Sequence, residues 1–393
     1  LKSKNYIENL ISEKIINNQH RVNFSLAPDI DFNNKKDQKI KDKIEQKSKK
    51  LSSEEKEKIV QLATELKMRQ ESIDNPEILP KVTKQDIPLS RSYAKPEIIK
   101  DGNIGNYFYK AGTNGITYHS MIFPCDSMSL DEFKVSSLFA NTLTDVGLGD
   151  KDYEEVQKIQ SAITGGISSN FVLIPDEMGG SPTVGLKISS KSLEVNESEM
   201  QSLMIQTIKE ANFRDKNRIN DMLNFISSSN ERSLIQNGHV LAMSNAGSQI
   251  NNIAATNDIA AGIKFITNTK HLANDINNNK NLERYIALLE SIKGKIIESP
   301  IYTFTASSLD LNDTSISLQH TAIDKLYKPQ NYFDIQDQSI GWITGAQVCY
   351  CAEAFPTVDF FHQDAPALTL LGAVLRNGYL HSAIREKGGA YGS

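Results

Sequence analysis

The stretch between Asn33 and Gln70 most strongly limits how this chain can fold, because half of its residues are charged and the two signs are mixed. Such a segment cannot form a hydrophobic core of its own. Its few apolar residues nevertheless recur at the spacing of one helix face, as at Ile40 and Ile44 and again around Leu62. The pattern predicts two consecutive amphipathic helices.

The break between these helices falls at residues 51–55. Ser52 and Glu55 fit a capping box there, which satisfies free backbone amides at the start of the second helix. We therefore predict a helical hairpin over residues 33–75. A solvated linker between domains accounts for its charge better than a binding role does.

Proline marks the segments on either side of the hairpin. Residues 20–28 alternate apolar and polar positions and end on a proline, which predicts a strand that closes an earlier domain. After the hairpin come Pro80, Pro88 and Pro96. Because proline fixes φ and disfavours helix in the residue before it, residues 76–94 are predicted to be an extended connector.

Residues 95–330 combine strand and helix patterns in the way that is typical of an α+β domain. Gly165-Gly166 suits the end of one helix, since glycine adopts a positive φ without strain. The part up to about residue 295 is predicted to be largely helical. The predicted strands lie at about 115–123, 167–174, 183–190 and 301–305, and predicted helices include about 135–146 and 153–163.

The pattern then begins again. A strand predicted at 346–351 precedes a helix that carries Leu368, Leu371 and Leu375, and a Gly-Gly pair follows, as at Gly165-Gly166. We expect a duplicated α+β domain whose second copy, residues 335–393, is truncated. The sequence begins without methionine and stops after a glycine-rich turn, so both ends are expected to be cut.

Composition narrows the functional classes. The 48 acidic residues outnumber the 43 basic ones, so the chain lacks the basic field that drives nucleic-acid binding. No apolar run approaches the roughly 20 residues that cross a bilayer. Cys125, Cys349 and Cys351 form neither a framework of pairs nor a metal-type spacing, which favours a reducing compartment such as the cytoplasm or an organelle matrix.

Several well-known catalytic motifs do not occur in the sequence. No histidine has the H-x-x-E-H context of a zinc site, and His362 and His381 are predicted to be surface or helix-packing residues. There is no G-x-S-x-G nucleophile turn and no phosphate-binding glycine loop. Cys349 and Cys351 fall on the strand predicted at 346–351, where buried thiols are usually inert. No metal site is predicted in this chain.

Two polar residues near the end of the chain are candidates for chemistry. Arg385 is predicted on the last turn of a helix and Tyr391 at the start of the next strand, and Gly388-Gly389 lets the backbone reverse between them. A guanidinium and a phenol can both donate to a peptide carbonyl, and such donors matter most when that oxygen becomes negative. The alternative is an arginine that pairs with local acids or stabilises the helix end, beside a packed strand tyrosine.

The same residues resemble a known motif. Leu-Arg-Asn-Gly-Tyr-Leu-His-Ser-Ala-Ile-Arg-Glu-Lys-Gly-Gly-Ala-Tyr-Gly at 375–392 is similar to the arginine-tyrosine motif of insulinase-type (pitrilysin-type) zinc metallopeptidases, specifically of the presequence-protease, falcilysin-like subfamily. The resemblance covers essentially the whole chain. Other stretches that agree in the same order include His20-Arg21-Val22, Gln85-Asp86-Ile87-Pro88, Thr113-Asn114-Gly115-Ile116 and Thr164-Gly165-Gly166-Ile167-Ser168.

The resemblance implies a protease of four homologous α+β domains, each an antiparallel sheet flanked by helices, in two halves that close around a chamber for unfolded peptides. It places the zinc in the first domain, in an N-terminal half, and not in this chain. The family's arginine and tyrosine correspond to Arg385 and Tyr391, which implies that these residues bind substrate and stabilise the transition state. By itself this chain is expected to be inactive. Its implied partners are unfolded peptides and the N-terminal half of the same polypeptide.

The resemblance also divides the chain. It implies the end of a second peptidase domain at 1–32, the hairpin at 33–75, the connector at 76–94, a third domain at 95–330 and the start of a fourth at 335–393. Some insulinase-type subunits have lost zinc and act as partners or scaffolds, so a non-catalytic peptide-binding subunit is the alternative function. An unrelated helical interaction protein would explain the charged hairpin but not the ordered set of motifs.

Overall fold

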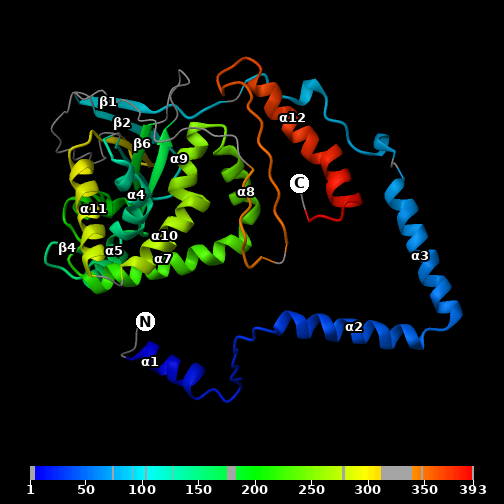
Figure 1. Cartoon of the computed structure of the whole chain (residues 1–393). Coiled ribbons are helices and arrows are strands. Elements are labelled where there is room, and N and C mark those ends of the chain that lie inside the picture. Colours follow the sequence, from blue (N-terminus) through cyan, green and yellow to red (C-terminus); the bar gives the residue numbers. More distant parts are fainter. Residues whose placement is uncertain are drawn as a thin grey trace. The chain divides into compact units, whose positions relative to one another are not determined.

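The structure, a computed structural model, describes residues 5–72, 75–90, 92–101, 104–125, 127–174, 183–276, 279–310, 339–346 and 348–391. The chain forms two compact units. The first comprises Leu1–Asp86 with Val374–Ser393, and the second comprises Ile87–Ala373. Figure 1 shows the elements of both units.

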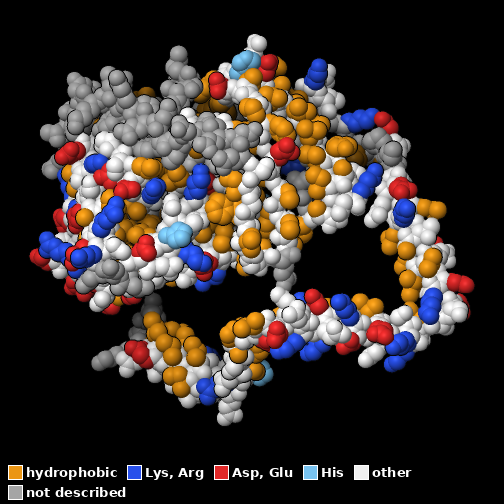
Figure 2. Space-filling view, in the orientation of Figure 1, with side chains coloured by type: hydrophobic (Ala, Val, Ile, Leu, Met, Phe, Trp, Pro, Cys, Tyr) orange, Lys and Arg blue, Asp and Glu red, His pale blue; other side chains and the backbone are white. Residues whose placement is uncertain are grey.

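The first unit contains two long helices, α2 (Phe32–Lys50) and α3 (Ser53–Glu71). The predicted capping box is present: Ser52 Oγ accepts from the Glu55 amide at 3.2 Å, and the Glu55 carboxylate accepts from the Ser52 amide at 2.8 Å. Neither helix buries a residue, and Figure 2 shows charged side chains of both signs along α2. The two predicted helices and the break between them are therefore confirmed.

The remaining elements of the first unit are short. α1 (Tyr6–Ile11) continues into the π-helical turn η1 (Ser12–Ile16), and a π-helix, η6 (His381–Lys387), lies near the other end of the chain. Residues 20–28 are exposed and form no strand. A strand is stable only when its backbone is paired, and the described residues give this segment no partner. The prediction of a strand at 20–28 is therefore wrong.

The second unit contains a six-stranded sheet with the order β1-β2-β8-β3-β6-β5. Neighbouring strands run antiparallel except β2 and β8, which are parallel, so this sheet is mixed where the resemblance implied an antiparallel one. The strands are β1 (Glu97–Asp101), β2 (Ile104–Lys110), β3 (Ile116–Pro124), β5 (Ile167–Ile174), β6 (Thr183–Leu193) and β8 (Tyr302–Ser307), with β4 (Gly147–Leu148) and β7 (Ala211–Asn212) as a separate pair.

Helices cover one face of this sheet. Along β3 buried and accessible side chains alternate, as expected for a sheet with one covered face. Figure 1 shows α4, α10 and α11 on one side of the strands. The helices are α4 (Leu130–Leu143), α5 (Tyr153–Ile163), α6 (Glu197–Lys209), α7 (Lys216–Gln236), α8 (Gly238–Gly247), α9 (Asn252–Ala261), α10 (Ile263–Asp275) and α11 (Asn279–Ile297), and α12 (Ala365–Asn377) crosses the boundary between the units.

The buried face of the sheet is apolar at one end and polar at the other. Met121 and Ile188 belong to the hydrophobic core, whereas Thr117 and His119, on the same face of β3, are buried among polar groups. His119 Nδ1 lies 2.8 Å from the hydroxyl of Thr305, and its Nε2 has no partner in the described part of the chain. Burial lowers the pKa of His119 to about 4, because the charged imidazole would be poorly solvated there.

The α+β class predicted from the sequence is confirmed. α5 and β5 begin and end where they were predicted, and β3, β6 and β8 are each present close to their predicted positions. Sequence reasoning missed β1 and β2, which precede the first predicted strand. No described helix is long and apolar enough to cross a membrane.

The prediction of a strand at 346–351 is wrong wherever the structure describes it. Residues 346 and 348–351 form no strand, and Cys349 and Cys351 are exposed, where sequence reasoning expected buried thiols. This segment contacts helices through its side chains, so its backbone has no neighbouring strand to pair with.

Candidate functional site

Arg385 and Tyr391 lie in the first unit, at and just after the end of η6. Arg385 is on the last turn of this helix, as predicted. Gly389 then adopts a φ of +72°, a left-handed conformation that strains residues with a Cβ, and its amide donates to the Arg385 carbonyl at 3.2 Å. The backbone therefore reverses immediately after the helix, as the glycine pair predicts.

This reversal brings the two side chains together. The Cζ atom of Arg385 lies 5.8 Å from the centroid of the Tyr391 ring, which is within the range of a cation-π contact. Tyr391 is 96 % exposed, so it is not the packed strand tyrosine of the alternative interpretation. None of the described acidic residues forms an ion pair with Arg385, in contrast to the other part of that alternative.

The arrangement leaves the guanidinium and the phenol accessible on one surface. Both groups are hydrogen-bond donors, and they sit on a turn whose conformation is fixed by backbone hydrogen bonds. Nearby on η6, His381 Nδ1 lies 3.4 Å from a carboxylate oxygen of Glu386. Chemically, such a surface can bind a group that accepts several hydrogen bonds, such as a carbonyl oxygen that acquires negative charge.

The histidines singled out from the sequence do not form a metal site in the part of the chain that is described. The side chains of His362 and His381 are 44 % and 43 % exposed, in agreement with surface positions. Across the described residues, no three His, Cys, Asp or Glu side chains gather as metal ligands do. The donor sets present there do not fit zinc.

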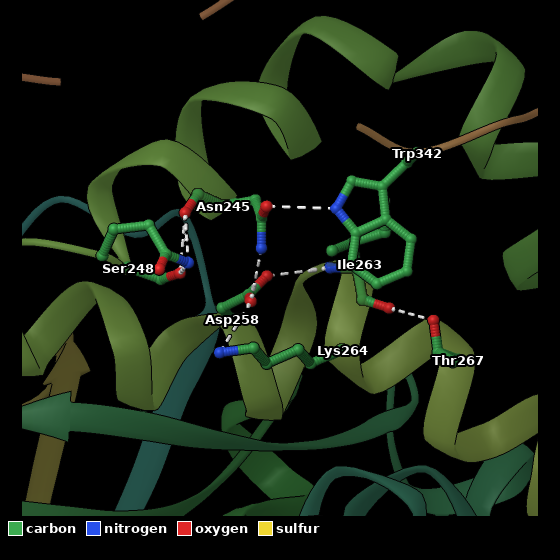
Figure 3. A network of polar contacts seen from close by, with 8 residues as sticks. Asn245, Ser248, Asp258, Ile263, Lys264, Thr267 and Trp342 are labelled. Atoms are coloured by element: carbon green, nitrogen blue, oxygen red, sulfur yellow. Dashed lines mark hydrogen bonds and ion pairs between the residues drawn. The ribbon is translucent and has the colours of Figure 1, made fainter. Parts of the chain in front are cut away.

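A second polar site lies in the second unit and was not predicted (Figure 3). At its centre is Asp258, whose side chain is fully buried. Its carboxylate accepts hydrogen bonds at 3.0 Å from the Asn245 side chain and at 3.0 Å from the Ile263 amide, and the Lys264 amine lies 3.8 Å away. A buried carboxylate needs such partners, because an unpaired charge in the interior is strongly unfavourable.

The network continues to the chain's single tryptophan. The indole Nε1 of Trp342 donates to the Asn245 side-chain oxygen at 3.1 Å, so Asn245 bridges Asp258 and Trp342 (Figure 3). The sequence offers no signal for this contact, because the indole and its acceptor lie 97 positions apart. Only a tryptophan in an otherwise polar connector could have drawn attention to it.

Comparison with known proteins identifies relatives along the whole chain. It is 27 % identical over 398 residues to the mitochondrial presequence protease of Drosophila melanogaster, which covers 100 % of this chain and 38 % of that protein. The corresponding protein of Yarrowia lipolytica is 24 % identical over 404 residues, covering 98 % and 40 %. Protein HypA of Clostridium perfringens is 24 % identical over 399 residues, covering 99 % and 41 %.

The chain thus spans about two fifths of the length of these curated relatives. The resemblance to presequence proteases drawn from the motif at 375–392 is confirmed by these matches. Independently, the family model for the region associated with peptidases of class M, family 16, subfamily C, matches residues 26–272, which is more than half of the chain. The chain therefore belongs to this peptidase-associated family.

Proposed function

We propose that this chain is the substrate-binding part of a zinc metalloendopeptidase that degrades unfolded peptides of the presequence type. One observation supports this most directly: Arg385 and Tyr391 lie together on an exposed turn, with their donor groups accessible. The similarity to presequence proteases over the whole chain supplies the class of substrate.

In this proposal Arg385 and Tyr391 act on the scissile carbonyl. The guanidinium and the phenol donate hydrogen bonds to the carbonyl oxygen, and these bonds strengthen as negative charge develops on it. The two side chains therefore bind substrate and stabilise the transition state. Zinc would be held by residues outside this chain, in an N-terminal half of the same polypeptide, and this chain alone would be inactive.

The proposed organisation follows from the same similarity. Residues 33–75 would link the end of a second domain to a third domain at 95–330, with the beginning of a fourth at 335–393. The two halves would enclose the peptide in a chamber. The relatives named as mitochondrial support an organelle matrix as the location.

The proposal is tested by peptide cleavage with the full-length protein in the presence of zinc. Arg385→Ala is expected to lower kcat/KM by about 100-fold or more, as loss of a transition-state donor does. Tyr391→Phe removes only the phenol hydroxyl and should also lower the rate. Lys387→Ala, which removes a positive charge from the same π-helix, should leave the rate nearly unchanged.

If the full-length protein does not cleave peptides, the chain acts instead as a non-catalytic peptide-binding or scaffold subunit. If the protein cleaves peptides and both variants match the wild type, Arg385 and Tyr391 have no role at the carbonyl. Circular dichroism of each variant shows that a lost rate does not come from a lost fold.

A further inference from the structure

Part of the second unit is an extended segment held on a helical surface by aromatic side chains. This segment, here called the strap, consists of residues 339–346 and 348–351, which have no helix or strand. Two of its rings, those of Trp342 and Tyr350, contact the helices. Nearly all other strap residues are exposed, so these two rings are its anchors.

The first anchor uses a prepared acceptor. The indole of Trp342 donates to the Asn245 side-chain oxygen at 3.1 Å, and the amide nitrogen of Asn245 is held by buried Asp258 at 3.0 Å (Figure 3). Asp258 thereby fixes the orientation of Asn245, leaving its oxygen free to receive a donor. Gly262 preserves this arrangement, since a Cβ there would lie 2.1 Å from the Asp258 carboxylate.

The second anchor uses a notch at the start of α8. The Tyr350 ring lies over Gly238, where an added Cβ would come within 2.3 Å of the ring. The Tyr350 hydroxyl donates to the Ile235 carbonyl at the end of α7 at 3.1 Å, and the His239 ring is 6.2 Å away. Glycine at position 238 therefore makes room for an aromatic side chain.

Both anchors are shallow. Trp342 is 45 % exposed and Tyr350 is 37 % exposed, and each makes one hydrogen bond to the helical surface. A contact of this kind is weak and reversible, because each ring remains partly in water and each donor could bond to water instead. Another chain with similar side chains can compete for the same surface.

We propose that the surface around Asn245 and Gly238 is a binding site for extended peptides, and that the strap occupies it in cis. The two acceptors, the Asn245 side-chain oxygen and the Ile235 carbonyl, select rings that carry a donor. The fitting ligand is therefore an unfolded segment with a tryptophan and a tyrosine eight positions apart, as in the strap. The ligand class rests on the proposed function, whereas the site rests on these contacts.

Binding of a labelled peptide to the chain tests the proposal. The probe is a fluorescein-labelled peptide with the sequence of residues 339–351, kept reduced, and its anisotropy is followed as protein is added. Tyr350→Ala weakens the strap but leaves the surface intact. It should bind the probe several-fold more tightly than the wild type, since more sites are open.

Gly238→Ala acts on the surface itself. The new methyl group fills the notch, so this variant should bind the probe at least tenfold more weakly than Tyr350→Ala does, although alanine suits a helix better than glycine. Gly247→Ala is the matched control on the same helix, because a Cβ there meets only the Ala254 methyl at an ordinary 3.5 Å. It should match the wild type.

The docked strap can also be observed directly, since Trp342 is the only tryptophan. Its fluorescence should become more accessible to acrylamide in Tyr350→Ala. The proposal is overturned if the probe binds no variant, if Tyr350→Ala and Gly238→Ala respond alike, or if a probe with both rings replaced by alanine binds equally well. A full-length protein that cleaves peptides but fails this test would retain the proposed function and lose only this site.

Discussion

His119 shows how strongly one buried position can set the pH response of the protein. Its imidazole is 2 % exposed and Nδ1 is engaged with Thr305, while burial holds its pKa at about 4, against 6.5 for an ordinary histidine. The unfolded chain therefore takes up this proton before the folded chain does. Stability contributed by neutral His119 is complete above pH 6.5 and is lost as pH falls through 4.

We expect the unfolding free energy to drop by about 3 kcal/mol between pH 6.5 and pH 4 through this residue alone. In His119→Gln, which cannot take up a proton there, the slope over this window should be much shallower. Denaturant unfolding at a series of pH values measures it. The exposed residue His271 provides the control, and an equal change of slope in His271→Gln would contradict the assignment.

At this scale the sequence predicts the site only where its parts are close together along the chain. Arg385 and Tyr391 are six positions apart, and one glycine at positive φ suffices to bring them together, so residue types alone indicate their proximity. Asp258, Asn245 and Trp342 meet through the packing of separate helices and the strap. No local pattern encodes such a meeting, so it could not be predicted.

Among the elements, α3 depends most on its own sequence. It buries no residue, so its stability comes from the capping box and from pairs along the helix such as Lys58 with Glu54 at 2.8 Å. The same independence made α2 and α3 predictable. The strands β1 and β2 were missed because β2 pairs with β8 across nearly 200 residues, and its own short sequence carries little of that information.

Removal of the cap should therefore weaken α3 without affecting the second unit. Ser52→Ala deletes the acceptor for the Glu55 amide and should cost about 1 kcal/mol of local helix stability. Amide hydrogen exchange in residues 53–71 should become several-fold faster. Ser53→Ala, one position later and inside the helix, should leave exchange unchanged, and similar acceleration in both variants would count against the capping role.

At the scale of the whole molecule, one buried carboxylate joins the first and last helices of the second unit's core, α4 and α11. Glu132 accepts hydrogen bonds from the Lys295 amine and the Ser291 hydroxyl, each at 2.6 Å. Burial alone would raise its pKa, but hydrogen bonds from Lys295, Ser291 and Ser129 outweigh burial and lower the pKa to about 2.

Loss of this charge should weaken the unit as a whole. Glu132→Gln is expected to reduce the unfolding free energy at pH 7 by about 3 kcal/mol, because Lys295 then loses its charged partner. The difference between variant and wild type should shrink as pH falls from about 4.5 toward 2, as the wild-type carboxylate becomes protonated.

Glu155→Gln is the matched control, since Glu155 holds the same capping-box position in α5 but is exposed. Thermal and denaturant unfolding should give a much smaller loss for this variant. Equal losses would show that the cap of the helix, and not the contact between α4 and α11, supplies the stability.

The place of β8 in the sheet also has a consequence for synthesis. β8 lies between β2 and β3 and begins at residue 302, so the sheet cannot be completed until the end of the second unit has been translated. At about 5–20 residues per second, the ribosome needs roughly 10 to 40 s to proceed from β2 to β8. During that interval the nascent chain holds two partial sheets with unpaired edges, which is the form of chain that chaperones bind and that aggregates without them.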